Sequence, residues 1–316
     1  MPLQQEHGVQ HTNHKERVNV KLKNILIIFL ALSSLAFASE SAIFGKDLIP
    51  NILAYDKEGS LHLGKWFTLL QSTYFKPIFL GVLIGVPTVF FIHYKIIGPM
   101  IFSHDRKKIY VFSIFNRIIH TIAAIAFILI VPTGFAIVFG TTLGGGEFIR
   151  FCKDVHSIAT ILFVISVIPM LMMWFKDMLP TSDDIKWMMI LGGYLNKRKD
   201  PIPAGRFNAG QKMWFYICTF GGIVMIITGA IMFFQDFKIE FIASLGLTQI
   251  DLLRASAIIH NILGFAVAAL FMTHIYMSVF AIKGAIHSII SGYKEEEEVE
   301  ILHSTFYKEL KKDKKL

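Results

Sequence analysis

Cysteine is scarce in this sequence. Its 316 residues include only two cysteines, Cys152 and Cys218. Two are too few for a disulfide framework or for an iron–sulfur cluster held by four thiolates. Any redox centre that the chain binds therefore needs ligands other than cysteine thiolate.

Charge is scarce as well. Asp, Glu, Lys and Arg make up 17% of the chain, against about 25% in an average soluble domain. By contrast, 54% of the residues are hydrophobic and the mean hydropathy is +0.56. This composition excludes a disordered protein and a soluble enzyme. It also excludes a nucleic-acid binder, because Lys- and Arg-rich cytoplasmic loops of a membrane protein explain the net charge of +8 better.

The apolar residues are gathered in runs long enough to cross a bilayer, which takes about 20 residues in a helix. We expect five spans, at residues 77–97, 113–139, 155–175, 213–234 and 255–282. A shorter apolar run at 24–38 follows several basic residues and ends in small residues at alternate positions, as in a secretory signal peptide. Residues 1–38 are therefore predicted to be a signal peptide or an uncleaved anchor, and the chain after them begins outside the cytoplasm.

Basic residues set the orientation. If the chain crosses at every run, most of its 31 Lys and Arg residues fall on one side, which is the cytoplasmic side by the positive-inside rule. The chain then divides into a periplasmic segment 39–76, an extra transmembrane helix with a cytoplasmic loop 77–109, a four-helix domain 110–292 and a charged tail 293–316. The C-terminus is predicted to be cytoplasmic. We interpret the Glu and Lys runs of the tail as a solvated helix or a frayed end without chemistry.

Four histidines lie inside the apolar runs, where an ionisable side chain is costly and usually functional. They are His120, His156, His260 and His274. His260 and His274 share one helix, about 21 Å apart along its axis and about 40° from the same face. Depth in the membrane pairs His274 with His120 on the cytoplasmic side, and His260 with His156 on the outer side.

Two imidazoles that face each other at one depth can bind the iron of a haem from both sides, as a low-spin electron-transfer haem requires. The four histidines therefore predict two haems stacked through the bilayer as an electron path. Taken singly, each histidine could instead bond to a neighbouring helix. Gly134, Gly229 and Gly264 could admit a porphyrin or only let helices pack closely.

Haem propionates need cationic partners, and three basic residues lie near the histidines. Arg117 and Lys153 each precede a histidine by three positions and so share its helix face. Arg254 lies just outside the run that contains His260. Each could equally extend toward the membrane interface without binding a cofactor.

Several segments together resemble a known family. They are FNRIIH at 115–120, the segment around His156, NAGQKM at 208–213, the helix from His260 to His274 with MTHIYM at 272–277, and the Lys283-Gly284 pair that follows. These segments are similar to the cytochrome b (gamma) subunit of membrane-bound respiratory formate dehydrogenases. The similarity spans residues 110–292.

The resemblance implies an all-α integral membrane protein in which four helices hold two b haems. It assigns His156 and His260 to the periplasmic-side haem and His120 and His274 to the cytoplasmic-side haem, in agreement with the depth argument. Electrons would come from an iron–sulfur (beta) subunit, fed by a molybdenum or tungsten catalytic (alpha) subunit that oxidises formate, and would leave to menaquinone.

The family's quinone pocket falls on Asn208, Gly210 and Gln211, near His274. Amide side chains and the free amides of a first helical turn can donate to a quinone carbonyl. Polar capping of a helix start is the other reading of this string. The chain itself would have no chemistry beyond quinone reduction, in a bacterial inner membrane.

The first part of the chain departs from the short form of the family. The signal-like segment, residues 39–76 and the helix 77–97 have no counterpart there, and docking of the partner subunits is one hypothesis for them. Two alternatives stay open for the function. One is the di-haem cytochrome b of a nickel–iron hydrogenase or of another molybdopterin oxidoreductase, and the other is a histidine-containing transporter or membrane anchor without haem.

Overall fold

The computed structural model describes residues 60–313, apart from residues 197, 237 and 238. The predicted signal peptide or anchor at 1–38, and the first part of the predicted periplasmic segment, lie outside the described residues. All-α architecture is confirmed: helices make up most of the described chain, and strands are limited to one short pair.

Five helical segments are long and apolar enough to span a membrane, as the sequence predicted. They are Gly64–Ile96, Ile114–Val138, Gly146–Trp174, Ala209–Phe233 and Gln249–Ala281. Their surfaces carry large exposed apolar side chains, such as Phe91, Ile158 and Met172, which suits contact with lipid rather than water. The chain is therefore a multi-pass membrane protein.

Three of these segments contain a π-helical turn. The first segment consists of α3 (Gly64–Leu69), η2 (Leu70–Tyr74) and α4 (Phe75–Ile96). The fourth consists of α8 (Ala209–Tyr216), η4 (Ile217–Gly221) and α9 (Gly222–Phe233). The fifth consists of α11 (Gln249–Ile275) and η5 (Tyr276–Ala281). The second and third are the uninterrupted helices α5 (Ile114–Val138) and α6 (Gly146–Trp174).

The first segment begins earlier than predicted, at Gly64 instead of residue 77. Polar residues at 71–73 and Lys76 lower the hydropathy there, although residues 71–73 lie within η2 and Lys76 within the first turn of α4. Hydropathy reports which residues tolerate lipid, whereas hydrogen bonding sets where the helix starts.

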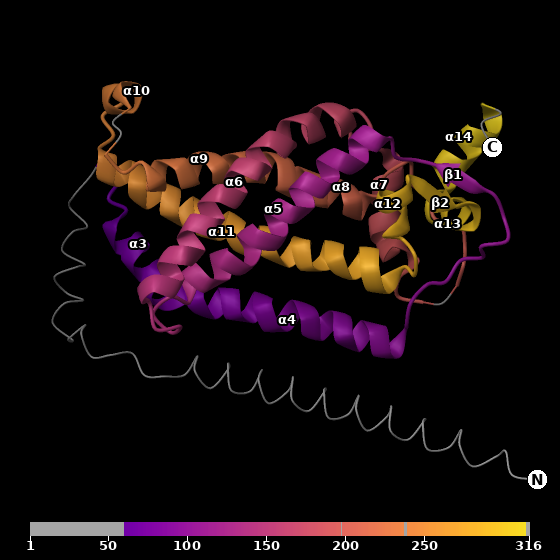
Figure 1. The fold of residues 1–316 in the computed structure, drawn as a ribbon, viewed down its shortest axis with the longest axis horizontal. Helices are drawn as coiled ribbons and strands as arrows, with labels where there is room; N and C mark the ends of the chain where they lie inside the picture. Colours follow the sequence, from indigo (N-terminus) through magenta and orange to yellow (C-terminus); the bar gives the residue numbers. More distant parts are fainter. Residues whose placement is uncertain (1–59, 197, 237–238, 314–316) are drawn as a thin grey trace, which may run out of the picture.

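The four later segments form the bundle, and α4 lies along its edge beside α11 (Figure 1). Phe127, midway along α5, contacts aromatic rings from three other helices: Phe163, Trp214 and Phe271. Such edge-to-face and stacked contacts stabilise beyond the burial of area alone. This aromatic layer forms the middle of the core.

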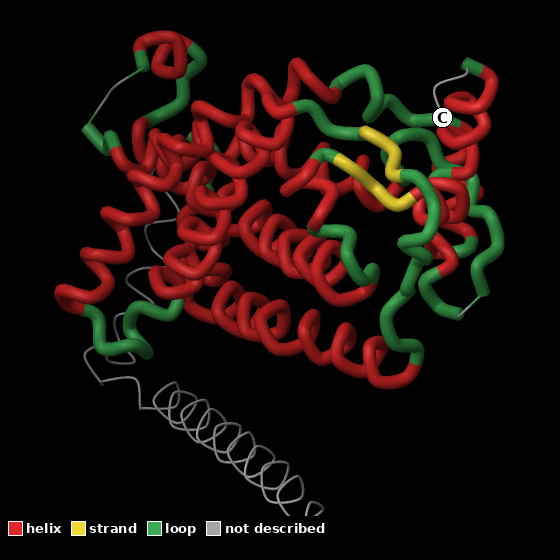
Figure 2. The backbone as a smooth tube through the Cα atoms, turned by 45° about the vertical axis from the view of Figure 1, so that its right-hand side comes forward, coloured by secondary structure: helices red, strands yellow, loops and turns green. Residues whose placement is uncertain are grey.

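A small folded cap covers one end of the bundle. It contains α7 (Ser182–Met189), η3 (Leu191–Gly193), α12 (His287–Ser291), α13 (Glu296–Leu302) and α14 (Ser304–Lys312). Strand β1 (Lys108–Tyr110) pairs antiparallel with β2 (Tyr293–Glu295) there, as Figure 2 shows. The short helix α10 (Glu240–Ser244) lies at the opposite end (Figure 1).

The interpretation of the tail as a solvated run is wrong for its Glu run, whereas Lys308, Lys311 and Lys312 are exposed on α14, as expected. Val299 and Leu302 are 0% and 2% exposed, and Lys294 forms a buried ion pair with Glu298. Other acidic side chains of the tail pair with basic residues that are distant in sequence, as in Lys199–Glu297 and Arg106–Glu300. A charge run can be buried in this way because partners from other segments offset the desolvation, and sequence spacing does not reveal them.

Candidate haem and quinone sites

The structure brings the four membrane histidines together as two facing pairs. The ring centroids of His120 on α5 and His274 on α11 are 6.2 Å apart, with 51° between the ring planes. Those of His156 on α6 and His260 on α11 are 6.5 Å apart, at 56°. The sequence pairing by depth therefore agrees with the geometry, and α11 contributes one ring to each pair.

Both spacings suit a single metal atom between two imidazoles. A nitrogen–metal bond to imidazole is about 2.0–2.1 Å long, and adding the distance from each nitrogen to its ring centre gives about 6 Å between two centroids. Among the described residues no group of three or more His, Cys, Asp or Glu side chains could hold a metal ion. Two axial imidazoles suffice only where a macrocycle supplies the other ligands, and so the donor set fits haem iron.

Hydrogen bonds set the tautomer of the His156–His260 pair, which we call the outer pair. Nδ1 of His156 lies 3.1 Å from the carbonyl oxygen of Ile130 and 3.1 Å from the Thr133 hydroxyl. A carbonyl can only accept, and the Thr133 hydroxyl already donates to Leu129, so Nδ1 of His156 must carry the hydrogen. Nε2 then keeps its lone pair for iron.

His260 repeats this arrangement. Its Nδ1 lies 3.0 Å from the hydroxyl of Thr228 on α9, which in turn donates to the carbonyl of Val224 at 2.9 Å. Each outer histidine is thus held by a threonine from a neighbouring helix. Orientation by such a partner fixes the ring and raises its basicity as a ligand.

Two glycines lie beside the outer rings. A Cβ at Gly134 would lie 3.4 Å from Cε1 of His156, and one at Gly229 would lie 3.5 Å from Cε1 of His260. Gly264 instead faces Phe79 of α4 and serves helix packing. At these distances Gly134 and Gly229 border the outer imidazoles in ordinary van der Waals contact, and the reading that they admit a porphyrin stays a prediction.

Sequence reasoning missed the threonines Thr133 and Thr228. A signal was present in the sequence. Thr133 directly precedes Gly134, and Thr228 directly precedes Gly229. The number of residues from the N-cap of the segment to the threonine is the same in both cases, counted from Ser113 and from Asn208. A repeated Thr-Gly pair at equal depth marks equivalent positions on α5 and α9.

The His120–His274 pair, the inner pair, is built differently. The indole of Trp214 on α8 stacks on the His274 ring, with centroids 5.5 Å apart and 20° between planes. Within the part of the chain that is described, the ring nitrogens of His120 and His274 have no hydrogen-bond partner. Stacking on Trp214 thus joins the start of α8 to the inner pair.

Asn208 and Gln211 form a capping box at the start of α8. Asn208 Oδ1 accepts from the Gln211 backbone N–H at 3.0 Å, and Gln211 Oε1 accepts from the Asn208 backbone N–H at 2.9 Å. The capping reading of this string is therefore confirmed. It does not exclude a quinone, because both side-chain oxygens are engaged while both NH₂ groups can still donate.

Gly210 lies between these two residues and packs against an aromatic ring of the cap. A Cβ added at Gly210 would come within 3.0 Å of the Trp187 ring. Any side chain at this position would press on the indole, and so the close approach favours glycine.

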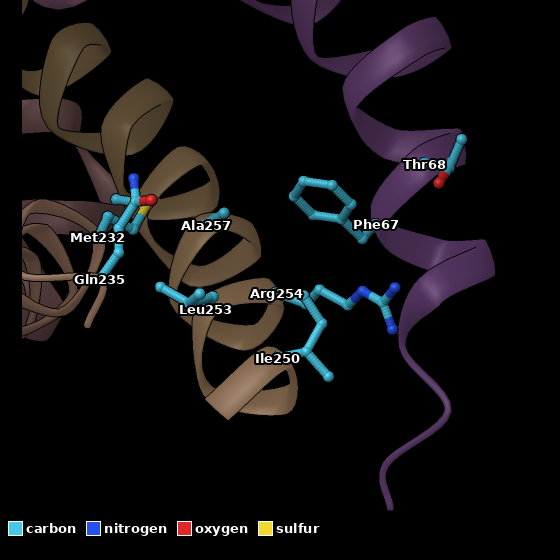
Figure 3. A pocket seen from close by; sticks show the side chains of 8 residues that line it. All are labelled: Phe67, Thr68, Met232, Gln235, Ile250, Leu253, Arg254 and Ala257. Atoms are coloured by element: carbon cyan, nitrogen blue, oxygen red, sulfur yellow. The ribbon is translucent and has the colours of Figure 1, made fainter. Parts of the chain in front are cut away.

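The three candidate propionate partners lie in different settings. Arg117 donates to the carbonyl of Ile290, and its buried Nε has no partner among the described residues, which leaves one N–H for an anion. Lys153 is exposed on α6. Arg254 is only 7% exposed and lines a pocket of about 370 Å³, where it extends from α11 toward Phe67 of α3 (Figure 3).

Comparison with known proteins agrees with this geometry. The family model for prokaryotic cytochrome b561 matches residues 111–292, which contain all four histidines. The chain belongs to the prokaryotic cytochrome b561 family. It is thus a multi-pass membrane cytochrome b, and the two histidine pairs are its candidate haem ligands.

Curated relatives of this cytochrome are subunits of one kind of complex. The formate dehydrogenase cytochrome b556 subunit of Haemophilus influenzae is 26% identical over 197 residues, which cover 61% of this chain and 79% of the relative. The nitrate-inducible formate dehydrogenase cytochrome b556(Fdn) subunit of Escherichia coli is 26% identical over 207 residues, with 62% and 89% covered. The cytochrome b556(fdo) subunit of the same organism is 24% identical over 208 residues, with 62% and 90% covered.

Proposed function

We propose that this chain is the haem b-containing membrane subunit of a formate dehydrogenase, which carries electrons from a periplasmic iron–sulfur subunit to menaquinone at the cytoplasmic side. One observation supports this above all others. Two facing imidazole pairs lie along α11, and a helix start with hydrogen-bond donors adjoins one of them. The relatives named as formate dehydrogenase subunits support the choice of donor.

His156 and His260 would hold one haem b, and His120 and His274 a second. When bound, haem b supplies reversible one-electron transfer. The protein holds the imidazoles in place, presents Nε2 toward the iron and surrounds it with apolar side chains, which together tune its potential. Arg117, Lys153 and Arg254 are the candidate partners of the propionates.

The quinone would bind where α8 begins, between the inner pair and the cap. The NH₂ groups of Asn208 and Gln211 can donate to a quinone carbonyl, and Gly210 packs against Trp187 of the cap between them. His274 lies next to this helix start, because Trp214 of α8 stacks on its ring. Quinol formation there would take its protons from the cytoplasm. Each electron that moves inward across the membrane works against about 2.3 kcal/mol per 100 mV, so the half-reaction conserves energy without a proton pump.

The partners would be an iron–sulfur subunit and a molybdenum or tungsten catalytic subunit, where formate oxidation itself takes place. The second candidate function is that of the same di-haem electron-transfer subunit with another electron donor, such as a nickel–iron hydrogenase or another molybdopterin oxidoreductase. The histidine pairs favour either candidate equally, because they indicate how electrons cross the membrane and not which enzyme supplies them.

Spectra of the purified complex test the proposal. Formate should produce the reduced b-type absorption bands, menaquinol analogues should form at the expense of formate, and extracted pigment should amount to two haems per chain. Reduction by hydrogen but not by formate would favour the second candidate. A protein without b-type bands would be a transporter or anchor, and the proposal would be wrong.

Orientation is tested separately. A tag at the C-terminus should be protected from protease in spheroplasts and cleaved in inverted vesicles of the inner membrane. Cleavage in intact spheroplasts would reverse the topology and place the cap outside.

A further inference from the structure

Helix α7 turns its apolar side chains outward. Met188 and Met189 lie three and four positions after Ile185 and so share one face of the helix with it. Ile185, Met188 and Met189 are 62%, 54% and 81% exposed. Ile190 and Leu191, which follow the helix directly, are exposed as well. We call these five residues the α7 face, and their exposure indicates contact with an apolar medium or partner outside the chain.

The opposite face of α7 holds the helix to the start of α8. Asp184 accepts a hydrogen bond from the Lys212 ammonium at 2.8 Å, and the Trp187 ring is the one against which Gly210 packs. Charge is thus buried toward the protein, while apolar side chains point away from it. A helix on a water-soluble domain has the reverse arrangement, whereas the outward surfaces of the spans are apolar like the α7 face.

A hydrogen-bonded histidine places the turn after α7 level with the end of a span. Nε2 of His93 lies 2.8 Å from the carbonyl oxygen of Tyr194, the residue that follows η3. A carbonyl can only accept, so Nε2 donates, and Nδ1 accepts from the Tyr276 hydroxyl at 2.6 Å. His93 lies in the last turn of α4. The turn after α7 therefore lies at the membrane boundary, and Figure 1 shows α13 and α14 farther from the bundle.

The backbone of this turn also fits apolar surroundings. Leu191 has a φ of 47°, a left-handed conformation that favours Gly, Asn or Asp in a turn exposed to water. Gly192 and Gly193 follow with positive φ, and a Cβ at Gly192 would come within 2.5 Å of the Trp187 ring. This close packing holds the turn in place, and so the leucine side chain stays on the outside despite the strain.

Exposed apolar side chains on other elements lie at the same end of the bundle. They include Ile96 at the end of α4, Ile114 and Phe115 at the start of α5, and Ile290 on α12. A protein partner would cover one side of the bundle, whereas lipid surrounds all of it. Apolar exposure on several elements therefore favours lipid as the medium that covers the α7 face.

Lys186 supplies a basic edge to this face. Its side chain is 65% exposed, and its ammonium lies 3.8 Å from the Asp183 carboxylate. A lysine can lay its methylene stem along an apolar surface while its ammonium reaches the lipid head groups. Anionic lipids attract a basic residue in this position.

We propose that the α7 face is an interfacial membrane contact, inserted among the acyl chains of the leaflet at the cap end, with Lys186 at the lipid phosphates. The eight residues of α7 make a helix about 12 Å long, which is too short to span the bilayer but sufficient to lie in its interface. Through Asp184 and Trp187 this contact holds the start of α8 at the membrane boundary. It goes beyond electron transfer and is the same for either electron donor.

Quenching of a bimane label measures the depth of the face in the purified complex, reconstituted into vesicles of phosphatidylethanolamine and phosphatidylglycerol. Met189→Cys and Ile185→Cys carry the label at two positions of the face. Phe91→Cys, on the exposed surface of α4 near His93, is the lipid reference. Lys311→Cys, exposed on α14, is the aqueous reference.

Two quenchers distinguish lipid from water. One is a phosphatidylcholine with a nitroxide near the head-group end of an acyl chain, and the other is a water-soluble nickel chelate. The native cysteines Cys152 and Cys218 are buried, and labelling of the unmodified complex gives their background.

The nitroxide lipid should quench both labels on the face within about twofold of the Phe91→Cys label and about threefold more strongly than the Lys311→Cys label, as expected for a helix buried about 5–10 Å in the interface. The nickel chelate should give the reverse order. Agreement between the two positions of the face excludes a local effect of either substitution.

Quenching of both labels by the chelate as strongly as the Lys311→Cys label would place the face in water and overturn the inference. Protection from both quenchers would show that a partner subunit or a second copy of the chain covers the face, and it would overturn the inference as well.

Discussion

The outer and inner histidine pairs have nearly the same ring spacing, 6.5 Å and 6.2 Å, but different surroundings. Each outer ring donates through Nδ1 to a threonine on a neighbouring helix. The inner pair is supported by the Trp214 ring, which stacks on His274. Equal spacing with unequal support is what we expect if both pairs hold the same kind of group and only the inner pair adjoins the proposed quinone site.

The difference has a physical basis. A hydrogen bond at Nδ1 fixes the rotamer and tautomer of a ligating imidazole, which favours a permanently held cofactor. Ring stacking restrains the plane but leaves the nitrogens without a fixed partner. We therefore expect the outer pair to be the more rigid and the inner pair to respond to what binds beside it.

Removal of a ligand should have the largest effect and tests the pairing itself. His120→Ala or His274→Ala should eliminate one haem and abolish quinone reduction, while formate still reduces the other haem. His156→Ala or His260→Ala should remove the outer haem and stop electrons before they reach the inner one. Reduced-minus-oxidised spectra and pigment per chain measure this. Loss of both haems together in every variant, or of neither, would contradict the pairing.

Removal of an anchoring hydroxyl should have a smaller effect that is confined to the outer pair. Thr133→Val or Thr228→Val leaves Nδ1 of one outer histidine without its threonine acceptor, and changes of this kind cost about 10- to 100-fold in metal affinity. Haem retention during dilution in detergent measures it. Thr121→Val is the control, because that hydroxyl bonds only to the carbonyl of Arg117 in its own helix. Equal loss in all three variants would remove the distinction between the pairs.

On the inner side, Gln211→Glu separates helix capping from quinone binding. Glutamate serves the capping box as well as glutamine does, yet it has no NH₂ group to donate. We expect the KM for quinone to rise about tenfold, the value of one hydrogen bond, with unchanged haem content and thermal stability. Gln211→Ala should also lose about 1 kcal/mol of helix stability. An unchanged KM in both variants would place the quinone elsewhere.

The smallest expected effect is a pH dependence confined to the cap at the inner end. Burial, with the nearby Lys294 ammonium, lowers the pKa of His303 to about 3, against about 6.5 in an unfolded chain. The folded cap therefore excludes the proton, and its stability falls as pH drops below about 6.5, by at most about 1.4 kcal/mol per unit from this group.

Hydrogen exchange of the cap amides at pH 7.5 and pH 5 measures this dependence. His303→Gln should flatten it, while exchange near the outer pair stays constant in both proteins. Acid-induced opening at both ends of the bundle would show that the cause is not His303.

Sequence reasoning could place the four histidines because depth and helix period are local properties. His260 and His274 share a helix, so their separation follows from the rise per residue, and depth then pairs each with a ring from α5 or α6. The threonine anchors were missed because a hydroxyl within an apolar run bonds readily to its own helix. Only the packing of neighbouring helices shows that it also receives a hydrogen bond from a histidine.

By itself the sequence determined that this chain spans a membrane and that imidazoles, not thiolates, are its candidate redox ligands. Hydropathy and residue type act along the chain, and no tertiary contact is needed to interpret them. The tertiary structure decided what depends on distant segments meeting. It packed the first part of the charged tail against distant segments by pairing β2 with β1 and Glu297 with Lys199, and it joined His93 of the extra helix to Tyr276. Burial of charge and the direction of a hydrogen bond depend on a partner residue from a distant segment, and only the folded chain brings that residue into contact.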